Sequence, residues 1–222
     1  MRKLGTFLAK YDEVDVKAIN ISIVVAFLLS TSLAQSPSPT IYSVDPAHSR
    51  IELTVFRSGL LKMIGHDHTI AAKGFSGRVR FNAENIGDSS VQLNIDAKSL
   101  VVLDDPSVSE KDRQQIQANM EEAKVLDVRE FSQITFHSTE IGRTAPAGES
   151  LLLRGRLKLH GVEKEIAFPV QLYLETNRLR VTGTAVIAQT DFGIKPIKAV
   201  AGGLRLKDQV NVKFDILAER SN

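Results

Sequence analysis

Three histidines near the first predicted strand could act together as metal ligands. His66 and His68 form an H-x-H pair, which on an extended segment projects both imidazoles to one face. With His48, which lies nearby in the sequence, they could supply three nitrogen ligands to zinc or copper. The chain has no cysteine to complete such a set. A metal site at His48, His66 and His68 is therefore one hypothesis. The alternative is that these histidines form hydrogen bonds within turns.

Catalytic chemistry has less support. Ser49 directly follows His48, but adjacent residues of a strand point to opposite faces and make a poor nucleophile and base pair. The sequence contains no nucleophile elbow, phosphate-binding loop or dinucleotide fingerprint. We therefore expect a protein that is not an enzyme.

The elements that would position any site are β-strands. Apolar and polar residues alternate with period two in eight segments, each with one apolar face. The first follows the turn at Asp45-Pro46, because proline biases the residue before it toward extended geometry. The eight segments are 51–55, 79–82, 91–97, 134–137, 151–160, 168–174, 179–187 and 210–216. The pattern predicts an all-β, antiparallel fold, without the βα alternation of a parallel sheet.

Closing eight such strands into a lipocalin-like β-barrel would remove the exposed edges of the sheet. An eight-stranded barrel can hold one small ligand. With strands of about 10 residues tilted by about 40°, the barrel would be about 25 Å tall and could take an extended chain lengthwise. Burial of about 12 carbons would contribute roughly 10 kcal/mol before entropic costs. The alternative, which periodicity does not distinguish, is a filled core.

One segment, 107–125, departs from the alternation. Ser107 and Glu110 have the spacing of a capping box, and Ile116, Met120 and Ala123 recur at helical spacing. The segment predicts one amphipathic helix that packs over an end or a side of the sheet.

The first 34 residues have the features of a cleaved signal peptide. An apolar run at 19–29 is shorter than the roughly 20 residues that span a bilayer, and small residues precede a cleavage site before Gln35. A cysteine-free exported chain is typical of a bacterial periplasm. The formal net charge of +2 and the absence of tryptophan disfavour a nucleic-acid partner. We expect a signal peptide at 1–34 and no membrane span in the mature chain.

Six motifs, in this order, resemble the YceI-like family of bacterial periplasmic proteins. They are YSVDPAHSRIELTV (42–55), GHDHTI (65–70), FSG (75–77), LDVREFSQITFHSTEI (126–141), GRLKLHGVEKEI (155–166) and TDFGI (190–194). The resemblance covers 42–219 as one domain. It implies a lipocalin-like barrel that binds polyisoprenoid or another amphiphilic lipid in its central cavity. Ser132 and Gln189 depart from the residues that many relatives carry there.

We therefore expect a periplasmic or secreted carrier. Its ligand would be a polyisoprenoid, an isoprenoid quinone precursor or a fatty-acid-like amphiphile, held non-covalently and without another cofactor. A homodimer is an open alternative to a monomer. The predicted cavity wall consists of Leu53, Val55, Phe81, Leu93, Ile95, Phe136, Leu157, Phe168, Phe192 and Ile194.

Overall fold

The computed structural model describes residues 38–58, 67–144, 150–199 and 204–221. All of them belong to one unit, Pro37–Asn222. The predicted signal peptide at 1–34 lies outside the described residues. Within the described ranges, no helix is both long and apolar enough to cross a membrane.

The described residues form one antiparallel sheet of twelve strands. The strands are β1 (Thr40–Val44), β2 (Arg50–Ser58), β3 (His68–Ala72), β4 (Phe75–Phe81), β5 (Ser90–Asp96), β6 (Leu100–Val102), β7 (Gln133–Arg143), β8 (Ser150–Leu159), β9 (Val162–Leu174), β10 (Arg178–Ala188), β11 (Lys198–Ala199) and β12 (Leu204–Arg220). The helices of this part of the chain are α1 (Glu110–Glu121) and the 3-10 helices η1 (Pro46–His48), η2 (Ile86–Asp88), η3 (Ala97–Ser99) and η4 (Gln189–Phe192).

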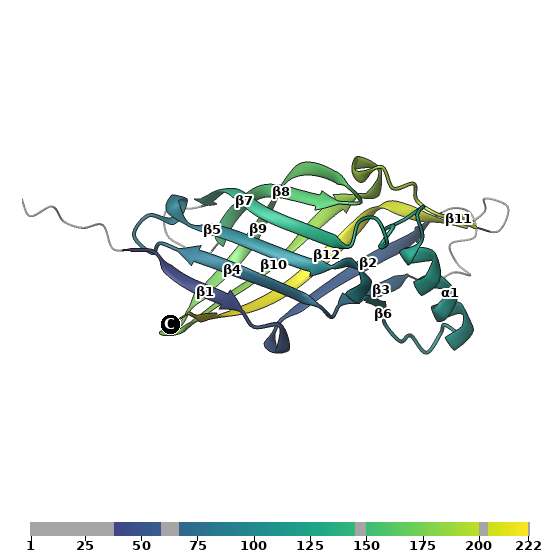
Figure 1. Ribbon diagram of the computed structural model, residues 1–222, viewed down its shortest axis with the longest axis horizontal. Coiled ribbons are helices and arrows are strands. Elements are labelled where there is room, and N and C mark those ends of the chain that lie inside the picture. The colour runs from purple at the N-terminus through teal and green to yellow at the C-terminus, as the bar shows by residue number, and fades with distance from the viewer. Residues whose placement is uncertain (1–37, 59–66, 145–149, 200–203, 222) are drawn as a thin grey trace, which may run out of the picture. The chain divides into compact units, whose positions relative to one another are not determined.

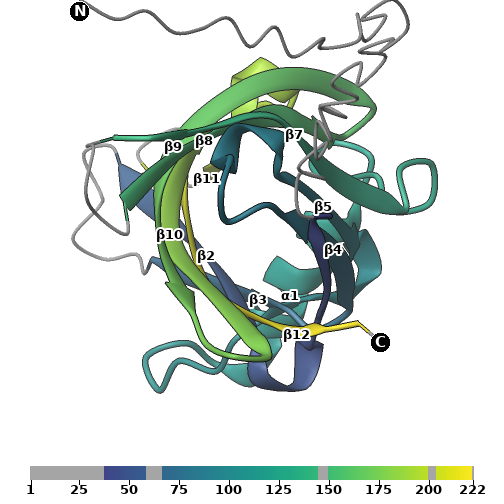
Figure 2. The ribbon, with the colours of Figure 1, turned by 90° about the vertical axis from the view of Figure 1, so that its left-hand side faces the viewer.

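Eight strands close into a barrel, which Figure 2 shows as a ring of strands. Their order is β1-β4-β5-β7-β8-β9-β10-β12, and β12 pairs back with β1. The predicted eight-stranded antiparallel barrel is thus confirmed. The strand predicted at 51–55 is β2, but β1 completes the ring in its place. The alternation in β1 covers only five residues, so the sequence pattern favoured the longer neighbour.

The sheet continues beyond the ring because β12 is long. Its last residues pair with β1 and most of the others with β2. Strand β2 then pairs with β3, and β3 with β6. At this side the first residues of β4, Phe75–Gly77, pair with β5 but not with β1 or β2. The ring is therefore complete near the C-terminus, and its strands diverge at the other end.

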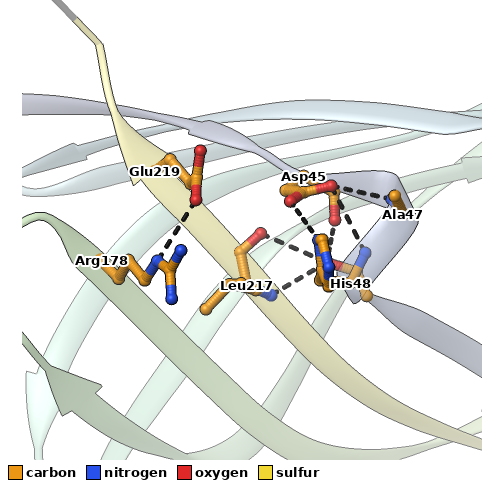
Figure 3. A network of polar contacts seen from close by, with 7 residues as sticks. Asp45, Ala47, His48, Arg178, Leu217 and Glu219 are labelled. Carbon is orange, nitrogen blue, oxygen red and sulfur yellow. Dashed lines mark hydrogen bonds and ion pairs between the residues drawn. The ribbon is translucent and has the colours of Figure 1, made fainter.

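A small polar network joins β1 and β2 to β12 (Figure 3). Asp45 accepts hydrogen bonds from the backbone N–H of Ala47 at 2.9 Å, and its Oδ2 lies 2.6 Å from His48 Nδ1. This hydrogen bond to His48 lowers the pKa of Asp45. Ser49 Oγ accepts from the N–H of Leu217 at 2.9 Å and lies 2.6 Å from the carbonyl oxygen of Asp45. Ser49 therefore has a structural role. Its hydroxyl accepts the hydrogen bond of a β12 residue at the point where the partner of β12 changes from β2 to β1.

The predicted helix is present as α1, at the opposite end of the barrel from the C-terminus (Figure 1). Its N-cap is Ser109 rather than Ser107, since Ser109 Oγ accepts from the N–H of Asp112 at 3.1 Å. The Ser107 hydroxyl instead bonds Asp105 within the preceding turn. Met120 is buried, whereas Ala123 lies beyond the end of the helix and is exposed.

One side chain fastens α1 to the sheet. The amide of Gln117 donates to the carbonyl oxygen of Leu100 at 2.9 Å and accepts from the N–H of Val102 at 2.9 Å. The Gln117 side chain thus provides the hydrogen bonds that a neighbouring strand would provide at the edge of β6. The backbone groups of Leu100 and Val102 therefore have hydrogen-bond partners.

Candidate functional site: an apolar cavity inside the barrel

The barrel encloses a cavity of about 240 Å³. Its lining comes from all eight strands of the ring and from β2, β3, β6 and α1. Among the described residues, no charged side chain lines it, and its three polar members are Gln92, Thr135 and Gln189. The first two belong to strands whose inward residues are their apolar neighbours, so their side chains point outward. The cavity can therefore accept apolar groups but offers few partners to polar ones.

Eight of the ten predicted wall residues line this cavity, and their contact with a ligand stays a prediction. The eight are Leu53, Val55, Leu93, Ile95, Phe136, Leu157, Phe168 and Ile194. The structure places the other two elsewhere. Phe81 lies at the last position of β4 and packs edge-on against Tyr42, with ring centroids 6.5 Å apart. Phe192 is only 1% exposed, because η4 turns it into a filled part of the core.

Three phenylalanine rings cross the inner wall in a row, which we call the phenylalanine belt: Phe136, Phe168 and Phe214. The ring centroids of Phe136 and Phe168 are 5.7 Å apart, and those of Phe168 and Phe214 are 5.6 Å apart. Glycines occupy the strands between them. A Cβ on Gly155 would meet the Phe136 ring, and one on Gly183 would lie 2.6 Å from Phe214 Cζ. The glycines thus let the rings lie against the wall.

Sequence reasoning missed part of this belt. Gly155 and Gly183 share the inward parity of their strands, and a glycine inside a strand often marks a close approach by another group. That signal was available for both residues. Which ring fills each position depends on the register between strands, which places Gly183 directly opposite Phe214.

The end of the cavity nearer the C-terminus, which we call the closed end, is a filled core. Its cluster consists of Tyr42, Val79, Phe81, Leu179 and Ala218. Ala218 is 0% exposed and Leu179 is 1% exposed, so no space continues past them. Val79 and Leu179 also belong to the cavity lining and therefore form its floor.

The other end, which we call the helix end, is covered by α1, by the segment after it and by η4. Met120 and Leu126 line the cavity there. Gln189 is the polar lining residue at this end, and its amide donates to the carbonyl oxygen of Lys207 at 2.8 Å. Thr190 binds Asp208 through both its N–H and its hydroxyl, at 2.9 and 2.7 Å. These contacts fix η4 to β12.

The three-histidine metal site does not form. His68 pairs with Val55 in the sheet, whereas His48 precedes the start of β2. Val55 lies six positions after Ser49 in the sequence. At about 3.3 Å per position, His48 and His68 lie roughly 20 Å apart. His66 lies outside the described residues. Within the described ranges, no group of three or more His, Cys, Asp or Glu side chains is placed to hold a metal ion.

A second hollow, of about 500 Å³, lies at the hairpin between β9 and β10. Its lining is Glu175, Thr176, Asn177, Arg178, Glu219 and Arg220. Two of these side chains pair with each other, because Arg178 Nε lies 3.2 Å from Glu219 Oε1 (Figure 3). Charged and polar walls do not suit an apolar ligand, so the smaller cavity inside the barrel is the better candidate site.

Comparison with known proteins agrees with this architecture. The family model described as the YceI-like domain matches residues 42–218. A UPF0312 protein of Vibrio cholerae is 26% identical over 181 residues, which cover 79% of this chain and 87% of that protein.

Two solved structures show the same fold. BcnA of Burkholderia cenocepacia aligns with a TM-score of 0.62 at 21% identity, covering 78% of this chain and 98% of that one. A polyisoprenoid binding domain from Saccharophagus degradans aligns with a TM-score of 0.56 at 18% identity, covering 81% and 98%. Since the family model spans well over half of the sequence, the chain belongs to the YceI-like domain family.

Proposed function

We propose that this protein is a periplasmic carrier that binds the apolar chain of an amphiphilic lipid inside its barrel. The observation that carries the proposal is the lining of the cavity, which has no charged side chain among the described residues. A polar ligand placed there would lose its hydrogen bonds to water without replacement, at a cost of roughly 2–7 kcal/mol per group. An apolar chain would instead gain about 0.8 kcal/mol for each buried methylene.

The relatives support the same class of ligand. The structural neighbour from Saccharophagus degradans is described as a polyisoprenoid binding domain. For this chain the candidate ligands are a polyisoprenoid, an isoprenoid quinone precursor or a fatty-acid-like amphiphile. The signal-peptide pattern at 1–34 supports export to the periplasm. A single chain suffices, because the cavity lies within one barrel. Among the described residues, the cavity lining provides no nucleophile paired with a base. Such a lining supports a role as a carrier more than a role as an enzyme.

The first test is the mass of whatever co-purifies with the protein. The protein is expressed with its own leader, purified from the periplasm without detergent, extracted with organic solvent and analysed by mass spectrometry. The proposal predicts an apolar or amphiphilic molecule in near-stoichiometric amount. A protein that carries no such molecule, and that also fails to bind added alkanoates in calorimetry, would contradict it.

A matched pair of variants locates the binding inside the barrel. Ala185 lines the cavity and is buried, whereas its neighbour Thr184 points outward and is exposed. Ala185→Phe fills part of the cavity with an apolar ring, so it should abolish binding while the protein stays folded. Thr184→Phe adds the same ring outside and should bind as the wild type does. Equal affinities of the two variants would place the ligand elsewhere.

A further inference from the structure

We infer that Arg57 holds an anionic head group at the helix end of the cavity, so that the barrel prefers amphiphiles that carry a carboxylate or a phosphate; this inference rests on the proposed function. The side chains of Ile51, Leu53 and Val55 line the cavity from β2. Arg57 is the next residue of β2 with the same parity, so it lies on the inner side of the strand, about 7 Å beyond Val55. The row of apolar wall residues on β2 thus ends in a cation.

The pairing with β12 also places Arg57 beside the cavity. Arg57 lies opposite Leu206, and Leu206 packs against the core cluster that contains Val55. The residue after Leu206 is Lys207, whose carbonyl oxygen accepts from the amide of Gln189 at 2.8 Å. Gln189 in turn lines the cavity. Arg57 therefore lies next to the lining along both β2 and β12, at the end of the barrel where Figure 1 shows α1.

The closed end does not suit a charged head group. Val79 and Leu179 form the floor there, and Ala218, at 0% exposure, packs in the same cluster. A carboxylate placed against this floor would lose its hydrogen bonds to water without replacement. At the helix end the side chain of Arg57 is 33% exposed, so a head group bound to it keeps access to water. The ligand therefore binds with its apolar chain toward Leu179 and its head group toward Arg57.

Asp67 is the carboxylate that accompanies Arg57, and it holds the guanidinium only loosely. Asp67 Oδ1 accepts from the backbone N–H of Arg57 at 3.0 Å, but it lies 3.8 Å from Arg57 Nε. This second distance is longer than a hydrogen bond. A carboxylate or phosphate on a ligand can form the bidentate contact with the guanidinium that Asp67 does not form. Asp67 therefore competes with the ligand for Arg57.

The presence of Arg57 divides the candidate ligands by charge. A fatty-acid-like carboxylate or an isoprenoid phosphate would gain a charge-assisted hydrogen bond at the helix end. A neutral amphiphile, such as an isoprenoid quinone precursor, would bind through its apolar chain without this gain. We therefore expect the protein to select anionic amphiphiles from a mixture of lipids with similar chains.

The test compares three ligands that share one alkyl chain and differ in the head group: decanoate, 1-decanol and decyltrimethylammonium. Calorimetry below their micelle concentrations and at about pH 7, where the carboxylate is ionised, gives the affinities. Decanoate should bind about tenfold more tightly than 1-decanol, since it adds a hydrogen bond to a charged group, and the cationic amphiphile should bind least. If decanoate binds no more tightly than 1-decanol, the inference is wrong and the proposed function stands. No binding of any of the three would instead contradict the proposed function.

A matched pair of substitutions assigns the preference to Arg57. Arg57→Gln removes the charge and should lower the affinity for decanoate about tenfold, with no change in the affinity for 1-decanol. Arg154→Gln is the control, because Arg154 lies on the outer side of β8 with its Nε 3.5 Å from a carboxylate oxygen of Glu140. It should leave both affinities unchanged. If Arg57→Gln weakens decanoate and 1-decanol equally, the residue supports the fold and not the head group, and the inference is wrong.

Asp67→Asn should have the opposite effect and keeps the inference testable if Arg57→Gln does not fold. Asparagine retains an oxygen for the backbone N–H of Arg57 but removes the competing charge. The affinity for decanoate should rise several-fold, and that for 1-decanol should not change. Inorganic phosphate, which has the charge without the chain, should not displace decanoate when both are present at the same concentration. A lower affinity for decanoate in Asp67→Asn, or displacement by phosphate, would overturn the inference.

Discussion

The two ends of this barrel are built from strands of the same apolar and polar alternation, yet one end is a filled core and the other borders a cavity. At the closed end, β1 pairs with β4 on one side and with β12 on the other. The inward side chains there meet across the ring, and Ala218 is 0% exposed. Toward the helix end, β2, β3 and β6 continue the sheet from β12 outside the ring, and α1 lies at that end of the barrel. The cavity thus remains at the end of the barrel where β1 does not pair with both of its neighbours to close the ring.

The largest expected effect compares two phenylalanines of one strand. Phe81 at the closed end and Phe75 at the helix end are each 8% exposed and both belong to β4. Phe81→Ala should lower the free energy of unfolding by about 4–5 kcal/mol, and Phe75→Ala by about 3 kcal/mol, since the less constrained end can relax around the lost ring. Urea denaturation measures both values. If Phe75→Ala costs as much as Phe81→Ala, the two ends do not differ in the way described.

A smaller loss of stability is expected from a substitution at Ser49, between β1 and β2. Ser49→Ala leaves the part-buried N–H of Leu217 without its 2.9 Å partner, which should cost about 1–3 kcal/mol in the free energy of unfolding. Ser43→Ala is the control, because the Ser43 hydroxyl is exposed and its hydrogen bond, at 2.8 Å, joins it to the hydroxyl of Ser221. It should change stability by less than about 0.5 kcal/mol. Equal effects of the two substitutions would argue against a structural role for Ser49.

The cover at the helix end is expected to affect kinetics more than stability. Gln117→Ala removes both hydrogen bonds to β6, at a cost of about 0.5–1.5 kcal/mol each. Dissociation of a bound alkanoate, followed by stopped-flow competition, should become several-fold faster. Gln114→Ala, on the exposed side of α1, should leave this rate unchanged. If neither substitution alters the rate, the ligand does not pass beneath α1.

The smallest expected effect concerns acid stability on the outer wall. Two hydrogen bonds from Arg180, at 2.7 and 2.5 Å, lower the pKa of Asp215. A carboxylate with a lowered folded pKa stabilises the protein above its unfolded pKa of about 4, and this contribution is lost as the pH falls through the folded value. Asp215→Asn should therefore lower the melting temperature at neutral pH, and the difference from the wild type should shrink as the pH falls below about 4. A difference that is constant across this range would contradict the assignment.

Much of the fold could be predicted from the chain itself. Period-two alternation located β2, β4, β5, β7 to β10 and β12, because each of them buries one face. Strand β1 was missed, since its five residues contain too few alternations to stand out beside Pro46. The cap of α1 was placed at Ser107 because two serines offer similar spacing. Ser109 caps the helix, since Asp105 occupies the hydroxyl of Ser107.

The site could be predicted only in part. Inward parity was sufficient to place seven predicted strand residues on the cavity wall, and Ile194, which follows η4, lies there as well. Parity does not reveal where a strand passes from cavity to filled core, which is why Phe81 at the end of β4 does not line the cavity. Phe192 lies in η4, where strand parity does not apply, and it packs into the filled core. The belt required the register that brings Gly183 opposite Phe214. The three-histidine hypothesis was wrong because His48 lies before the start of β2, whereas His68 pairs with Val55 farther along that strand.

The most direct test of the account is a crystal structure of the mature protein with decanoate at saturating concentration. The account predicts an alkyl chain between Leu179 and Met120, with its methyl end against Leu179 and its carboxylate toward α1. Density for the ligand outside the barrel, for example at the hollow lined by Glu175 and Arg178, with the cavity still empty, would contradict it.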